Sequence, residues 1–511
     1  MSLAIVYSRA SMGVQAPLVT IEVHLSNGKP GFTLVGLPEK TVKEAQDRVR
    51  SALLNANFKY PAKRITVNLA PADLPKDGGR FDLPIAIGIL AASEQVNPER
   101  LKQFELLGEL ALTGQLRGVH GIIPAILAAK KVRRCPIIAR QNANEAALVA
   151  DQKSYFAQNL LEVVQFINEQ EKLPLATDLA TQSAADFPFK NQADLTDIIG
   201  QQHAKRALTI AAAGQHNLLL LGPPGTGKTM LASRLTGLLP EMTEQEAIET
   251  ASVTSLVQNE LNFQNWKQRP FRAPHHSASL PALVGGGTIP RPGEISLSHN
   301  GVLFLDELPE FDRKVLDALR QPLESGEIII SRANAKICFP AKFQLIAAMN
   351  PSPTGHYTGV HNRTSPQQVM RYLNRLSGPF LDRFDLSIEV PLLPKGALQH
   401  IENKGETSKQ VRSKIIKVRE IQFARAGKIN AHLSSKEIER DCKISSEDGI
   451  FLENTLTQLG LSVRAYHRIL KVARTIADLN NEKQIQRPHL AEALSYRAMD
   501  RLLQKLSKNL G

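Results

Sequence analysis

Residues 222–229 read Gly222-Pro223-Pro224-Gly225-Thr226-Gly227-Lys228-Thr229, which matches the phosphate-binding pattern G-x-x-x-x-G-K-[ST]. The loop stands between an apolar run, 217–221, and a helical run, 230–239, as the pattern requires. In that context the loop's backbone N–H groups and the positive end of the helix dipole surround the phosphates. We expect all eight residues to bind a nucleoside triphosphate, with Lys228 on the β- and γ-phosphates and the Thr229 hydroxyl on Mg²⁺.

A second apolar run, 301–305, ends in two adjacent carboxylates, Asp306 and Glu307, and is typical of a buried Walker B strand. We expect Asp306 to hold Mg²⁺ through water and Glu307 to orient and deprotonate the attacking water. A third run, 343–349, ends at Asn350, whose amide suits the sensor 1 role. Together they predict hydrolysis of the triphosphate. A solvated acidic turn and an ordinary strand-to-turn Asn are the alternatives.

Two arginines are candidates for neutralising charge on the transferred phosphate, which phosphoryl transfer requires. Arg383 lies in the run Gly378-Pro379-Phe380-Leu381-Asp382-Arg383, and Arg464 opens a helical segment rich in Arg and Ala. From spacing alone, either side chain could instead form a surface ion pair.

The order of these motifs resembles an AAA+ ATPase, and further strings narrow the resemblance to the magnesium-chelatase-like branch and its ComM/YifB family. These strings are Phe271-Arg272-Ala273-Pro274-His275-His276, Leu283-Val284-Gly285-Gly286-Gly287, Arg291-Pro292-Gly293-Glu294-Ile295-Ser296, Val35-Gly36-Leu37-Pro38 and Asn68-Leu69-Ala70-Pro71-Ala72-Asp73-Leu74-Pro75. The resemblance covers nearly the whole chain. It implies ATP and Mg²⁺ as cofactors and a homo-oligomeric ring, usually a hexamer, with ATP sites between subunits. Arg383 would be the finger acting on the neighbour's nucleotide, and Arg464 would be sensor 2.

The length of 511 residues suits about three domains. The expected fold class is α/β, in four parts: a Lon-protease-like N-terminal domain at 1–168, a linker at 169–193, an AAA+ core with a parallel sheet at 194–394, and a helical lid at 395–511. In the first part, the pattern predicts strands at 18–25, 65–69 and 104–112 and helices at 41–56 and 83–93.

The resemblance of the N-terminal part to the Lon proteolytic domain raises a rival activity. That domain uses a Ser nucleophile activated by a Lys. In this chain, alignment on Pro75-Lys76-Asp77-Gly78 puts Arg80 where the Ser is expected, and the Lys position falls near Ile123. We therefore expect this domain to be proteolytically inactive and to act as an assembly or partner-binding scaffold.

A hairpin is predicted immediately before the expected sensor 1 strand at 343–349, from two short strands at 327–330 and 336–339. By resemblance to helicases of this group, the hairpin would project into the channel of the ring. Arg332 and Lys336 would then contact DNA phosphates, which attract cations without conveying sequence. A polar tip that faces solvent is the alternative.

Composition agrees with a soluble nucleotide enzyme. An excess of 62 Lys and Arg over 49 Asp and Glu gives a net charge of +13, which permits a polyanionic partner. The three cysteines are far apart, which favours a reducing compartment. No apolar run approaches the ~18 residues that span a bilayer, and the first residues lack the features of a signal peptide. We expect a cytoplasmic protein without membrane contact.

These observations predict an ATP hydrolase that moves along single-stranded and branched DNA. The most specific form of the hypothesis is a branch-migration helicase for homologous recombination or natural transformation, working with recombination factors. Two alternatives remain open. One is a chelatase-type motor that remodels a protein partner, and the other is an adaptor whose ring only assembles other factors.

Overall fold

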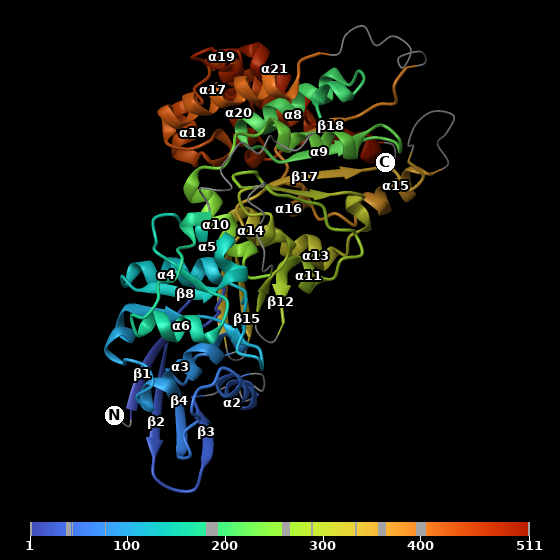
Figure 1. Ribbon diagram of the computed structural model, residues 1–511. Coiled ribbons are helices and arrows are strands. Elements are labelled where there is room, and N and C mark those ends of the chain that lie inside the picture. Colours follow the sequence, from blue (N-terminus) through green and yellow to red (C-terminus); the bar gives the residue numbers. More distant parts are fainter. Residues whose placement is uncertain are drawn as a thin grey trace.

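The computed structural model describes residues 3–36, 42, 44–76, 78–179, 193–257, 266–287, 290–332, 335–355, 364–394 and 405–508. Figure 1 shows an elongated molecule in three parts. An N-terminal α/β domain, in blue and teal, lies at one end. A sheet flanked by helices lies in the middle, and a group of helices, in orange and red, covers the other end.

The central sheet is fully parallel, with the order β11-β14-β17-β10-β18. Its strands are β11 (Phe271–Arg272), β14 (Val302–Leu305), β17 (Gln344–Met349), β10 (Leu218–Leu221) and β18 (Leu386–Glu389). The inner strands β14, β17 and β10 are buried throughout, which explains why β10 and β14 are apolar at every position and β17 is apolar after Gln344. Because parallel strands end on the same side, the segments after β10, β14 and β17 meet at one edge of the sheet.

Successive leucines of β10 point to opposite faces of this sheet. Leu218 and Leu220 pack with α8 (Gln202–Gly214), α9 (Lys228–Leu238), α17 (Ser408–Ala426) and α20 (Val463–Leu479). Leu219 and Leu221 pack on the other face with α13 (Arg313–Ala318), α15 (Pro366–Leu373), α16 (Gly378–Leu381) and α22 (Ala498–Lys508). The C-terminal region is helical, as expected, and it contributes to both faces. Its remaining helices are α18 (Ser435–Asp441), α19 (Ser446–Leu459) and α21 (Arg487–Ser495).

The N-terminal domain is built on a mixed sheet of order β1-β2-β4-β3. Its strands are β1 (Leu3–Arg9), β2 (Leu18–Ser26), β4 (Arg64–Ala70) and β3 (Gly31–Val35), covered by α2 (Ala45–Asn55) and α3 (Asp82–Ala92). A smaller parallel sheet, β5-β8-β9, adjoins it, with β5 (Phe104–Leu106), β8 (Cys135–Ala139) and β9 (Tyr155–Ala157). The helices α4 (Ile122–Lys131), α5 (Ala143–Ala147) and α6 (Leu160–Ile167) complete the domain.

Two expectations for this domain need correction. The single strand expected at 104–112 is divided into β5 and the short β6 (Glu109–Leu110), which belong to different sheets. The chain turns between them because the hydrogen bonds of Gly108 are not made to a neighbouring strand. Gly108 donates its N–H to the Arg80 carbonyl, and its own carbonyl accepts from the Leu83 N–H. The helix expected at 41–56 corresponds to α2, which begins at Ala45, and Val42 is helical as well, while Glu44 is in a turn; Thr41 and Lys43 lie outside the described residues.

The start of the expected linker is attached to the N-terminal domain. Leu173 and Ala176 are buried in its core. Ala176 also donates its N–H to the Ser154 carbonyl, and Phe156 donates to the Pro174 carbonyl. Residues 180–192, which make up most of the remaining linker, lie outside the described residues.

A buried carboxyl group lies where the N-terminal domain meets the central part. Glu145 of α5 is buried beside Ser255, which follows α10 (Glu244–Thr254). Burial raises the pKa of Glu145 to about 8, and the hydrogen bond from Asn142 Nδ2 to Glu145 Oε2 offsets only part of this effect. In the folded protein the carboxyl therefore holds its proton over a pH range in which the unfolded chain releases it.

The consequence is a loss of stability as pH rises from about 4.5 to about 8, because the folded state binds the extra proton in that window. We expect Glu145→Gln to raise the unfolding temperature in mildly alkaline buffer and to change it little in mildly acidic buffer. Thermal unfolding of both proteins across this pH range measures the effect, with Glu99→Gln at an exposed position as the control. Equal shifts at all pH values would contradict the assignment.

Candidate nucleotide site

The loop between β10 and α9 has the shape of a phosphate cradle. Gly225 and Gly227 adopt φ of +78° and +83°, a left-handed backbone that favours glycine. Lys228 is buried, and its Nζ donates to the carbonyls of Gly222 at 2.7 Å and Pro223 at 2.9 Å. Burial lowers the pKa of Lys228. The ammonium thus lies inside the curve of the loop, where phosphate oxygens would replace the carbonyls as its partners.

The three strand ends expected to meet at this edge do so. Lys228 Nζ lies 3.2 Å from Asn350 Oδ1, the residue after β17. Thr229 Oγ1 donates to Asp306 Oδ2, after β14, at 2.7 Å. A hydroxyl and a carboxylate are hard oxygen ligands of the kind that Mg²⁺ prefers, so this pair fits the metal. Thr229 and Asp306 would hold Mg²⁺, which would neutralise charge on the phosphates.

Glu307 contacts His276, a residue for which the sequence predicted no role in the site. Its Oε2 lies 3.2 Å from His276 Nδ1, and its side chain is otherwise more than half exposed. The backbone of Glu307 is left-handed, with φ of +53°, and its N–H donates to Asp306 Oδ1 at 2.9 Å. His276 follows β11, which is the outermost strand of the sheet and pairs with β14. The position of His276 after that strand was the available signal, but strand order was needed to interpret it.

The two arginines lie at the opposite edge of the sheet. Arg383 precedes β18, and its carbonyl accepts from Asn217 Nδ2 at 2.9 Å, immediately before β10. The phosphate loop follows the other end of β10, four residues away, or about 13 Å at ~3.3 Å per residue. Arg383 forms an ion pair with Glu324 of α14 (Arg320–Ser325).

Arg464 belongs to the same basic cluster. Burial lowers the pKa of Arg383, and the neighbouring guanidinium groups of Arg468, Arg320 and Arg464 lower it further. Arg464 is exposed at the start of α20, beside Val463, a residue that is 75% exposed. The residues predicted for the nucleotide site therefore form two groups, one at each edge of the sheet.

The expected hairpin is confirmed. It consists of β15 (Glu327–Arg332) and β16 (Ala335–Pro340), paired from Glu327 with Pro340 to Arg332 with Ala335, and it precedes β17. Lys336 is exposed near its tip. The side chain of Arg332 lies outside the part of the chain that the structure describes.

In the N-terminal domain, the residues at the two expected protease positions are part of the core. Arg80 is buried and donates to the carbonyls of Arg9, at 3.2 Å, and His120. Ile123 is fully buried in α4. Arg80 therefore connects β1 to the segment before α4.

Comparisons with known proteins agree with this architecture. Residues 194–398 match the family described as magnesium chelatase, subunit ChlI; residues 21–142 match subunit ChlI of Mg-chelatase, and residues 405–497 match its C-terminal part. The chain is 83% identical to the competence protein ComM of Haemophilus influenzae, over 99% of this chain and 100% of that protein. It belongs to the ComM/YifB family. YifB of Salmonella typhimurium is 59% identical over the full length of both chains.

Part of the chain is also similar to a magnesium-chelatase subunit. The magnesium-chelatase 38 kDa subunit of Rhodobacter capsulatus is 29% identical over 42% of this chain and 59% of its own length. The expected fold class, α/β with a magnesium-chelatase-like AAA+ core and a helical C-terminal region, is confirmed. Within the described residues, no helix combines the length and the apolar character needed to cross a bilayer.

Proposed function

We propose that this ComM/YifB protein is a cytoplasmic, ring-forming ATPase, most simply a hexamer, that drives branch migration of DNA during homologous recombination in natural transformation. One observation supports the proposal that the subunits form a ring: the phosphate loop and Arg383 lie at opposite edges of one sheet. A chain with this arrangement cannot bring Arg383 to its own nucleotide. A neighbour in a ring can supply it, since head-to-tail contacts pair unlike faces of successive subunits.

In the proposed site, one subunit contributes Lys228, the pair Thr229 and Asp306, and the base Glu307. The adjacent subunit contributes Arg383, and Arg464 from the same cluster acts with it. Asn350 orients the attacking water or the γ-phosphate. Glu307 accepts the water proton as the water oxygen bonds to the γ-phosphorus and the bond from that phosphorus to the bridging oxygen of ADP breaks, and the guanidinium neutralises charge on the phosphate oxygens.

Three observations support DNA as the substrate. The relative with 83% identity is named a competence protein. The chain carries a net charge of +13, and Lys336 is exposed near the tip of a hairpin that precedes the Asn350 strand. We infer that Arg332 and Lys336 contact phosphates of single-stranded or branched DNA in the ring channel, with recombination factors as further partners.

Replacing both residues tests this contact. We expect Arg332→Ala with Lys336→Ala to weaken DNA binding and to reduce the slope of log affinity against log salt by about 1.5, since each lost phosphate contact removes ~0.7 to 0.9. Titrations of a labelled oligonucleotide at several salt concentrations measure the slope. The matched control is Lys436→Ala with Lys443→Ala, two exposed lysines of the C-terminal region. An unchanged slope would show that Arg332 and Lys336 make no contact with DNA phosphates and that the hairpin tip faces solvent.

The overall function is tested with forked and four-way DNA. We expect DNA to stimulate ATP hydrolysis, and ATP to drive strand movement that Lys228→Ala abolishes. Hydrolysis that is indifferent to DNA, without strand movement, would instead favour a motor that remodels a protein partner, as the relationship to the magnesium-chelatase subunit suggests.

A further inference from the structure

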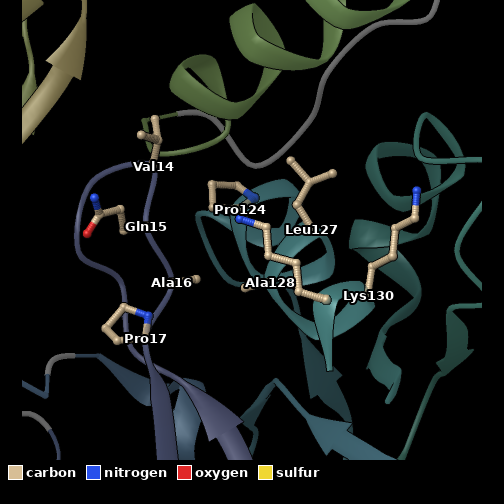
Figure 2. Close-up of a pocket in the computed structure, with 9 residues that line it drawn as sticks. Val14, Gln15, Ala16, Pro17, Pro124, Leu127, Ala128 and Lys130 are labelled. Carbon is tan, nitrogen blue, oxygen red and sulfur yellow. The ribbon is translucent and has the colours of Figure 1, made fainter. Parts of the chain in front are cut away.

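The N-terminal domain contacts the β15–β16 hairpin directly. Val14, in the loop between β1 and β2, packs into the ATPase core cluster that contains Ile337 and Phe339 of β16. At Gly13, where φ is +58°, an added Cβ would lie 2.6 Å from Ile337 Cγ2. The backbone of the loop therefore touches the hairpin with no room for a side chain. Figure 2 shows Val14 at the end of this loop, which faces α4 across a groove of about 680 Å³.

The base of the loop is fixed to the N-terminal domain by Arg9. This buried guanidinium bonds both carboxylate oxygens of Glu105 at 2.7 Å and the carbonyls of Ala16 at 3.1 Å and Ala128 at 3.2 Å. A hydrogen bond of 3.0 Å from the Ala10 N–H to the Pro17 carbonyl closes the loop. Removing one partner of a buried pair leaves an uncompensated charge, so such a pair resists opening. The loop and the domain thus form one rigid unit.

A second contact joins the N-terminal domain to α10. Gly121, immediately before α4, donates its N–H to the Ser255 carbonyl at 2.7 Å. Ala251 of α10 is part of the hydrophobic cluster around α4. The helix α10 is bonded in turn to the segment before β14, since Thr250 Oγ1 donates to the His299 carbonyl and Asn300 Nδ2 donates to the Glu246 carbonyl.

Both contacts are close to the catalytic strands in the sequence. The hairpin leads into β17, which is followed by Asn350, and α10 is hydrogen-bonded to the turn before β14, which is followed by Asp306 and Glu307. The two turns are connected, because Asn300 donates its N–H to the Lys342 carbonyl. Close-packed surfaces of this kind move as units rather than deform continuously.

We propose that the N-terminal domain is a lever that moves as one body with the β15–β16 hairpin when ATP binds. This inference rests on the proposed ATPase function and requires, in addition, that ATP moves the hairpin. The N-terminal domain then transmits the movement of the hairpin to any partner bound at the end of the domain that lies away from the ATPase core.

Distance measurements between spin labels test the lever in the full-length protein, with its three cysteines replaced by alanine. Labels replace three exposed residues: Glu99 in the N-terminal domain, Lys336 in the hairpin and Lys414 in α17. Samples without nucleotide are compared with ATP-bound samples that carry Glu307→Gln. We expect the 99–336 distance to stay constant and the 99–414 distance to change. A 99–336 distance that changes with ATP, or a 99–414 distance that does not, overturns the proposal.

Gly13→Ala provides a second test. Its Cβ presses on Ile337, so we expect the 99–336 distribution to shift and to depend on ATP. Adding Ile337→Ala removes the contacting methyl group and restores the distribution. Gly78→Ala is the matched control, because Gly78 has a similar φ of +76° and nothing within 4 Å of the added Cβ. An unchanged distribution in Gly13→Ala overturns the proposal.

Activity distinguishes this proposal from the proposed function. We expect Gly13→Ala to hydrolyse ATP and to lose strand movement on four-way DNA, and we expect Ile337→Ala to restore that movement. If the unaltered protein moves no DNA, the branch-migration proposal fails, while the distances still test the lever.

Discussion

Glu307→Gln is expected to bind ATP as tightly as the unaltered protein and to hydrolyse it about 10² to 10⁴ times more slowly, the range attributed to general-base catalysis. The amide keeps the size of the carboxylate and can still contact His276, which lies 3.2 Å from Glu307 in the structure. The amide cannot accept the proton of the attacking water. Binding of a fluorescent ATP analogue and release of phosphate measure the two quantities separately.

Two further variants serve as controls for this experiment. Lys228→Ala removes the ammonium from the cradle and should lose ATP binding itself. Glu310→Gln changes a nearby carboxylate that pairs with Arg375 on the surface, and it should leave turnover unchanged. Normal hydrolysis by Glu307→Gln would show that another group is the base.

Arg383→Ala is expected to bind ATP and to lose turnover by about 10³- to 10⁵-fold, the effect assigned to arginine fingers. The loss should be partly reversed by mixing this variant with Glu307→Gln. A subunit with intact Glu307 then provides the cradle, and a Glu307→Gln neighbour provides Arg383. In a random equal mixture about a quarter of the sites are complete, since each site takes its two halves from different subunits.

The control mixture contains Arg383→Ala and the double variant Arg383→Ala/Glu307→Gln, which share no intact Arg383 and therefore form no complete site. ATP hydrolysis is measured across the mixing ratios after the subunits have exchanged. If every mixture of the two single variants stays inactive while rings still form, Arg383 does not act on a neighbour's nucleotide. Full activity of Arg383→Ala alone would remove it from the site.

Several features of the site could be predicted from local sequence because they depend on backbone conformation and burial. Gly225 and Gly227, in the loop before Lys228, have the positive φ that the phosphate cradle needs. The strand before Asp306 was predicted from its unbroken apolar sequence, the strand before Asn350 was predicted as well, and both are buried in the parallel sheet. The hairpin before β17 was also predicted correctly, since two short strands with a polar turn pair locally.

Other features depended on strand order and on packing between distant segments. The contact of His276 with Glu307 exists because β11 pairs with β14, which periodicity does not reveal. The strand expected at 104–112 is divided because Gly108 bonds to Arg80 and Leu83, which are distant in the sequence. The contact of Gly13 with Ile337 joins segments from opposite halves of the chain, and neither residue signals the other.

The sequence by itself determined the nucleotide loop, the order of the catalytic motifs and the helical C-terminal region, because each follows from the conformational preferences and burial of neighbouring residues. Only the tertiary structure decided that Arg383 and the phosphate loop lie at opposite edges of the sheet and that the N-terminal domain rests on the hairpin. Side chains from separate segments meet according to strand order and close packing, which are properties of the whole folded chain.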